Sequence, residues 1–219
     1  EYRNNVDLCW RIASIFLENQ ENNKQGARLL EEYVTNVKGL KAESKVRLYG
    51  NIGQLYSIDG DYSVALQYCW RGLELLESSP LIPNRSKYMS KFLAVLGDNA
   101  YGLEQYQTAI EYYEQSLEIF QKREDDDLLA DASLALVNEG AAYLELGQHK
   151  KVLSVLDELE ELIPKIPESQ KDDIQILWGN LRAQLYMNEG NLEQAEYELE
   201  AAKELLNTDD VEYSLNKDV

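Results

Sequence analysis

The chain has 219 residues, of which 44% are hydrophobic, and this is enough to bury a continuous core in one domain or one repeat array. Its formal net charge of −19 disfavours nucleic acid and anionic membrane surfaces as partners, and favours basic or neutral ones. No apolar run reaches the roughly 18 residues that a bilayer-spanning helix needs. We therefore expect no nucleic-acid partner and no membrane insertion by this segment.

Residues 1–41 predict two helices. A stripe of apolar side chains at helical spacing marks the first, from Asp7 to Glu18, and Gly26-Ala27 opens the second. Ala27 lies 38 residues before Ala65, which does not fit the spacing found later in the chain. This unit is therefore predicted to be either a degenerate repeat or a cap, as terminal repeats often are.

From residue 42 onward, small residues recur at a fixed period. One series lies in predicted first helices, and a second follows twelve residues later in predicted second helices: Gly53, Gly97, Gly140 and Ala183, then Ala65, Ala109, Val152 and Ala195. Both series step by 44, 43 and 43 residues. Small residues at both positions allow paired helices to approach closely, and Tyr56, Tyr62 and Tyr68 are expected to surround the first contact. The period predicts repeated helix hairpins and almost no strand.

Breaks between the predicted helices also repeat. Gly60, Gly147 and Gly190 occupy the turn inside three hairpins, where glycine adopts a left-handed backbone at the lowest cost. The remaining hairpin has Glu104 at this position, with Gly102 two residues earlier. Between hairpins, the pairs Pro80/Pro83 and Pro164/Pro167 predict helix ends, because proline lacks a backbone donor and restricts the residue before it.

The stretch from Gly53 to Leu75 resembles a tetratricopeptide repeat, whose small-large-small pattern over two antiparallel helices it follows. The resemblance implies an all-α fold, a right-handed solenoid of about five helix hairpins. We place the repeats at approximately residues 1–41, 42–79, 84–123, 127–163 and 168–206, with 207–219 as a C-terminal tail or a linker to a missing domain. The period of about 43 exceeds the usual 34. Such long repeats resemble those of kinesin light chains, bacterial peptide-pheromone receptors and sensor regions that precede bacterial signalling domains.

The resemblance also implies that first helices line a concave face that contacts peptides. The residues that match its contact positions are Arg47, Asn51, Gln54, Lys91, Asp98, Tyr101, Leu134, Asn138, Ala141, Glu145, Asn180, Gln184 and Met187. Amide side chains both donate and accept, so they can hold an extended backbone, while an aromatic or Met side chain adds contact area. Arg47 and Lys91 are the only cations in this set, which departs from the family's dicarboxylate-clamp subset. Glutamate runs on second helices are predicted to be solvated convex faces, as at Glu196, Glu198 and Glu200.

Motifs for catalysis, metal binding or cofactor binding are missing from the sequence. His149 is the single histidine, and Cys9 and Cys69 have no C-x-x-C neighbour, so we expect both cysteines to be buried small hydrophobes. Asp125-Asp126-Asp127 is predicted to open a helix, where carboxylates interact with the helix dipole. No catalytic residue, metal or cofactor is predicted.

These patterns together predict a non-catalytic module that binds a protein or peptide segment. The abrupt start at Glu1 suggests a segment of a longer protein, so we expect the sensory or regulatory region of a bacterial signalling protein, for example ahead of a GGDEF-type output domain. The alternatives are a passive scaffold or oligomerisation element and an intracellular peptide-pheromone receptor domain. The partner could be a downstream domain of the same protein or another copy, and both cytoplasm and periplasm stay open as locations.

Overall fold

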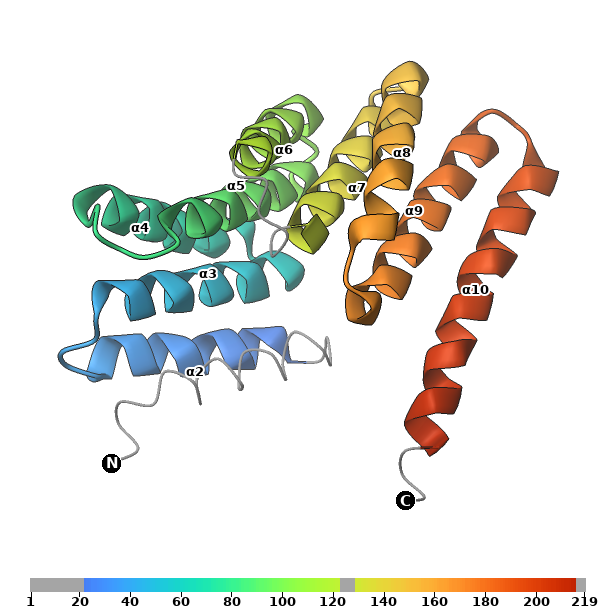
Figure 1. The fold of residues 1–219 in the computed structure, drawn as a ribbon. Helices are drawn as coiled ribbons and strands as arrows, with labels where there is room; N and C mark the ends of the chain where they lie inside the picture. Colours follow the sequence, from blue (N-terminus) through green and yellow to red (C-terminus); the bar gives the residue numbers. More distant parts are fainter. Residues whose placement is uncertain (1–21, 123–128, 216–219) are drawn as a thin grey trace. The chain divides into compact units, whose positions relative to one another are not determined.

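The structure, a computed structural model, describes residues 22–122 and 129–215, with side chains as far as Leu206. All regular structure in these two ranges is helical (Figure 1). The helices, with one 3-10 turn, are α2 (Asn23–Asn36), α3 (Ala42–Ile58), α4 (Tyr62–Ser78), α5 (Arg85–Gly102), α6 (Tyr106–Gln121), α7 (Leu129–Glu145), α8 (His149–Leu162), η3 (Ile163–Lys165), α9 (Glu168–Asn188) and α10 (Leu192–Leu215). The predictions for Asp7 to Glu18, for Cys9 and for Asp125-Asp126-Asp127 lie outside the described residues.

The chain divides into two compact units, Glu1–Ile119 and Phe120–Val219. In the first unit, α2 packs on α3, α3 packs on α4, and α5 contacts both α3 and α4. In the second unit, α7 packs on α8 and α9, and α9 packs on α10. Helix α10 continues to Leu215, whereas the sequence analysis ends the last repeat at residue 206.

Each of the four helix hairpins turns in the same way. After α3, the amide of Gly60 donates to the carbonyl of Ser57 at 3.1 Å, and the amide of Asp61 donates to the carbonyl of Tyr56 at 2.9 Å. Equivalent pairs of bonds follow α5, α7 and α9, and this pairing satisfies carbonyls left free at a helix end. The left-handed residues have the φ angles 81° at Gly60, 60° at Glu104, 67° at Gly147 and 79° at Gly190. The predicted glycine turns are confirmed, and Glu104 adopts the same conformation without being glycine.

Proline positions coincide with helix ends, as predicted. Helix α4 ends at Ser78, ahead of Pro80 and Pro83. Pro164 lies in η3, and α9 begins directly after Pro167. In the segment between α4 and α5, Ile82 is buried while Leu81 is exposed, so Ile82 anchors this connection to the core.

Close packing explains the small residues of the first helices. A Cβ placed on Gly53 would lie 3.1 Å from the Sγ atom of Cys69, and one placed on Gly97 would lie 2.4 Å from the ring of Tyr113. Cys69 is fully buried, which confirms its prediction. The ring of Tyr62 packs beside Gly102, 2.2 Å from where a Cβ would lie, and its predicted place around the Gly53 contact stays a prediction.

Side chains of α9 link it to α8 and to α10 in the second unit. The indole Nε1 of Trp178 donates to the carbonyl of Leu156 at 3.2 Å, and the Arg182 guanidinium lies 4.4 Å from the centre of the Trp178 ring. Arg182 also forms an ion pair with Glu198 of α10 at 3.0 Å. Glu198 is only 5% exposed, so the prediction that it belongs to a solvated face is wrong. A carboxylate this deeply buried needs such a partner.

Candidate functional site

A cavity of about 360 Å³ lies in the first unit, between α3 and α5. Helix α3 contributes lining residues at positions 46, 47, 50, 51 and 54, and α5 contributes them at positions 87, 88, 91, 92 and 95. The two sets have the same spacing, which selects one face of each helix. The eleventh residue, Asn84, comes directly before α5 and has a left-handed backbone with φ 52°. The site is therefore built by equivalent faces of two consecutive first helices.

The polar lining of the cavity carries positive charge. Arg47, Lys87 and Lys91 contribute cationic groups, and the amide side chains come from Asn51, Gln54 and Asn84. None of the eleven lining residues is acidic, although the whole chain has a formal net charge of −19. The cavity is thus a local basic region on an acidic protein, and it favours an anionic group.

The remaining wall of the cavity is apolar. Val46 is fully buried, Phe92 is 2% exposed, and Val95 is 8% exposed. The Phe92 ring fills the space beside Gly72 of α4, where an added Cβ would meet it at 2.0 Å. The ring therefore packs against α4, and an apolar, largely buried floor lies beside the three cations.

Tyr88 adds a phenol to this wall. Its hydroxyl donates to Oε1 of Glu43 at 3.2 Å. Burial raises the pKa of Tyr88 above its ordinary value, the Glu43 carboxylate adds to that rise, and Arg47 opposes it. Tyr88 therefore stays neutral at pH 7, and the positive charge of the cavity is not reduced by a phenolate.

Four of the residues predicted to bind a peptide come together at this cavity: Arg47, Asn51, Gln54 and Lys91. The two others on α5 are not among its lining residues. Asp98 accepts a hydrogen bond from the hydroxyl of Tyr113 at 2.8 Å, and the Tyr101 ring meets the Tyr106 ring edge-on at 5.4 Å between centres. Both side chains therefore interact with α6.

The other predicted residues belong to the second unit. Leu134, Asn138, Ala141 and Glu145 lie on α7, and Asn180, Gln184 and Met187 lie on α9. Leu134, Glu145, Gln184 and Met187 are exposed, while Asn138, Ala141 and Asn180 are half-buried. None of them lines the cavity of the first unit. Their role in binding stays a prediction.

The sequence analysis did not select Lys87, Tyr88 and Asn84. Lys87 precedes Lys91 by one helical turn, as Arg47 precedes Asn51, so the signal was present in the spacing. It was missed because only the positions matched to the family pattern were considered. Lys87 matters most, because it raises the number of cations at the site from two to three.

Two general features were also searched in the part of the chain that the structure describes. No group of three or more His, Cys, Asp or Glu side chains there is arranged to hold a metal ion. No helix there is long and apolar enough to cross a membrane.

A model of the tetratricopeptide repeat family matches residues 89–165. These residues are tetratricopeptide repeats. They cover α5 from Met89 onward, α6, α7, α8 and η3, and so include the periodic glycines at positions 97, 140 and 147. A search of the curated proteins found no match.

Solved structures extend the similarity to most of the chain. BtubC (BKLC) from P. vanneervenii is 15% identical with a TM-score of 0.68, over 94% of this chain and 81% of that one. A set of nearly identical TPR-like repeats of the kinesin light chain type from Podosopora anserina is 18% identical with a TM-score of 0.64, over 96% and 98% of the two chains. A Rap protein complexed with Competence and Sporulation Factor is 12% identical with a TM-score of 0.68, over 89% and 53%. At these identities the likeness shows the fold, and it confirms the predicted class of tetratricopeptide-type helix hairpins.

Proposed function

We propose that this chain is a non-catalytic module that binds a peptide or protein segment in the cavity between α3 and α5. One observation carries the proposal: side chains that the family pattern marks for peptide contact converge there from two helices. A tetratricopeptide repeat fold typically serves as a protein-binding scaffold and not as an enzyme. The similar Rap structure, complexed with Competence and Sporulation Factor, adds a precedent on the same fold.

The chemistry of the lining indicates what the bound segment carries. Arg47 presents a planar fork that matches a carboxylate, and Lys87 and Lys91 add two ammonium groups. We therefore expect an acidic side chain or a C-terminal carboxylate at this end of the ligand. An apolar side chain next to it would cover Phe92 and Val95, while the amides of Asn51 and Gln54 hold the backbone.

The net charge of the protein shapes how such a ligand binds. A total of −19 repels an acidic segment at long range, so association depends on the local field of the three cations. Salt screens both effects, but the contact inside the cavity is screened less than the repulsion from the surface. We therefore expect affinity to rise modestly as ionic strength increases.

Peptide selection followed by binding measurements tests the proposal. Peptides with free C-termini are selected from a random library on the full chain, and their dissociation constants are measured by fluorescence anisotropy. Lys87→Gln and Lys91→Gln should each weaken binding about tenfold, in the range of a charge-assisted hydrogen bond. Lys45→Gln, on α3 but outside the cavity lining, removes the same charge and should leave affinity unchanged. Equal affinities for the Lys45 and Lys91 variants would contradict the proposed site.

The finer hypothesis concerns what binding does. We propose that occupation of the first unit regulates an adjoining part of a larger signalling protein, for example a GGDEF-type output domain. The support for this step is the sequence analysis alone. Fusing the chain to its natural downstream segment and measuring the activity of that segment with and without a selected peptide tests it, and an activity that ignores the peptide would refute it.

A further inference from the structure

The last helix of the second unit exposes a row of leucines. Leu192, Leu199 and Leu206 of α10 are 68%, 44% and 55% exposed. They are seven residues apart, so they follow one line along the helix with a drift of only about 20° per step. Leucines spaced in this way supply one of the two positions of a helix-packing heptad, and the charged residues Glu196 and Lys203 occupy the other.

The row is separate from the face of α10 that packs on α9. That face consists of Ala195, Glu198 and Ala202, all of them buried. At about 100° per residue, the leucines lie roughly 60–80° around the helix from this face. Packing on α9 therefore leaves the leucine row open to solvent, and the exposed fractions of the three leucines agree.

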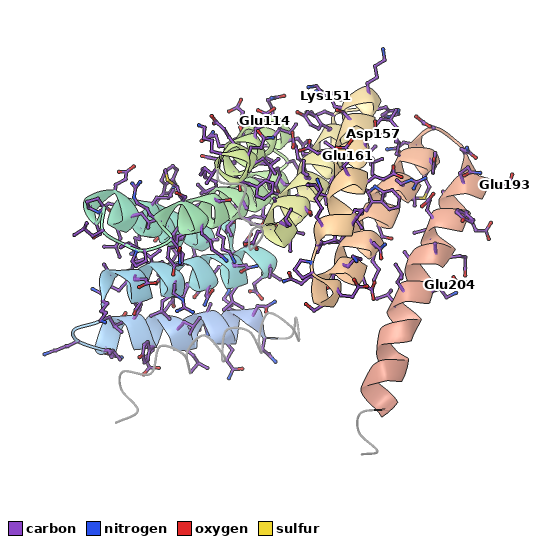
Figure 2. The ribbon with its side chains drawn as sticks, viewed as in Figure 1. Glu114, Lys151, Asp157, Glu161, Glu193 and Glu204 are labelled. Carbon is purple, nitrogen blue, oxygen red and sulfur yellow. The ribbon has the colours of Figure 1, made fainter. Side chains whose placement is uncertain are left out.

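Exposed glutamates lie on the side of α10 away from α9: Glu193, Glu196, Glu200 and Glu204. Glu196 is one turn from both Leu192 and Leu199, Glu193 and Glu200 directly follow a leucine, and Glu204 lies farthest around the helix from the row. Figure 2 shows Glu193 and Glu204 projecting from α10 on the side away from α9. Lys203 is the one basic residue between Leu192 and Leu206, and it pairs with Glu200 at 3.4 Å. The surface thus combines an apolar row with a flank of excess negative charge.

We propose that this surface of α10, the Leu192–Leu199–Leu206 row with its glutamate flank, docks an amphipathic helix of a partner protein that carries Lys or Arg beside its apolar stripe. Leucines seven residues apart fit the apolar stripe of such a helix, and the glutamates fit its cations. Charge complementarity selects this occupant over a second copy of the chain, because a second copy would bring another set of glutamates to the same surface. The site is independent of the cavity in the first unit.

Three designed peptides of about 21 residues, long enough to form helices, provide the probes. The first carries a leucine stripe flanked by lysines, the second carries the same stripe flanked by glutamates, and the third has the composition of the first with its leucines spread around the helix. Binding to the full chain is measured by fluorescence anisotropy. The first peptide should bind, and the second and third should bind at least about tenfold more weakly.

Substitutions locate the binding. Leu199→Ser should weaken binding of the first peptide about tenfold. Glu200→Gln should weaken it about threefold. Gln194→Ser is the control, because Gln194 is exposed on the side of α10 away from both the leucines and the glutamates, and it should change nothing. Circular dichroism confirms that each variant is folded.

Several results would overturn the proposal. Equal binding of the first and third peptides would show a nonspecific attraction to an acidic protein, and failure of the first peptide to bind at millimolar concentration would show that the surface takes no such helix. Self-association of the chain in sedimentation velocity that Leu199→Ser abolishes would assign the surface to a second copy.

Discussion

Replacing Glu104 with glycine should stabilise the protein. Glu104 occupies the turn position where the three other hairpins have glycine, and it has the same left-handed backbone with φ 60°. A residue with a Cβ pays about 1–2 kcal/mol for this conformation. Glycine also raises the conformational entropy of the unfolded chain, and this opposes the gain from removing the strain by about 0.4–1 kcal/mol. The net expectation for Glu104→Gly is an increase of about 1 kcal/mol in the free energy of unfolding.

A thermal melt followed by circular dichroism measures this change. For a chain of this size, 1 kcal/mol corresponds to a rise of about 2–4 °C in Tm. Glu104→Gln is the control, because it keeps the Cβ and removes only the unfavourable charge at the C-terminal end of α5. Gly190→Ala, at φ 79°, should lower stability by about 1 kcal/mol. A Tm for Glu104→Gly no higher than that of Glu104→Gln would refute the claim that the turn is strained.

Three further predictions concern packing, a buried ion pair and pH. Gly97→Ala should lower the free energy of unfolding, measured by urea titration, by about 1–3 kcal/mol, because the added Cβ would overlap the Tyr113 ring. Gly179→Ala should raise it by about 0.5–1 kcal/mol, because the nearest atom to its Cβ would be 3.7 Å away. Changes of the same sign in both variants would contradict the close-packing argument. Arg182→Met should lower the free energy of unfolding by about 3 kcal/mol, because it leaves Glu198 buried and unpaired. Adding Glu198→Gln should recover part of this loss. Effects of the two substitutions that simply add would count against the ion pair. Burial raises the pKa of the Cys69 thiol to about 12. The contribution of Cys69 to stability should therefore be constant below about pH 9, where the folded and unfolded states both hold the proton, and should fall between pH 9 and 12, where only the unfolded state loses it. An unchanged alkaline stability profile in Cys69→Ala would show that Cys69 does not cause this fall.

The sequence predicted the hairpin architecture because its signals are local and repeated. A residue with a left-handed backbone, most often glycine, commonly follows a helix end, so Gly60, Gly147 and Gly190 could be located from the sequence alone. The period even located the exception at Glu104. Tyr62 shows the limit of this reasoning, since its contact with Gly102 joins two different repeats.

The candidate site could be predicted only in part. Arg47, Asn51, Gln54 and Lys91, which the family pattern selected, all line one cavity, because helical spacing fixes which side chains share a face. Their contact with a peptide stays a prediction. The pattern could not show that Asp98 turns toward Tyr113 of α6, since this depends on a hydrogen bond between helices.

The same limit applies to charge. Glu198 lies in a run of acidic residues, and only the three-dimensional structure shows that Arg182 of α9 neutralises it inside the second unit. Sequence spacing gives the face of a helix but not what covers that face.

The position of a bound peptide tests the central claim most directly. Val46 and Val95 line the cavity, while Val155 is buried in the second unit and is the reference. Their methyl signals can be followed by NMR in the full chain as a selected peptide is added. The signals of Val46 and Val95 should shift with the same dissociation constant as the anisotropy titration, and that of Val155 should not move. A peptide that binds without shifting either cavity valine would contradict the assignment of the site.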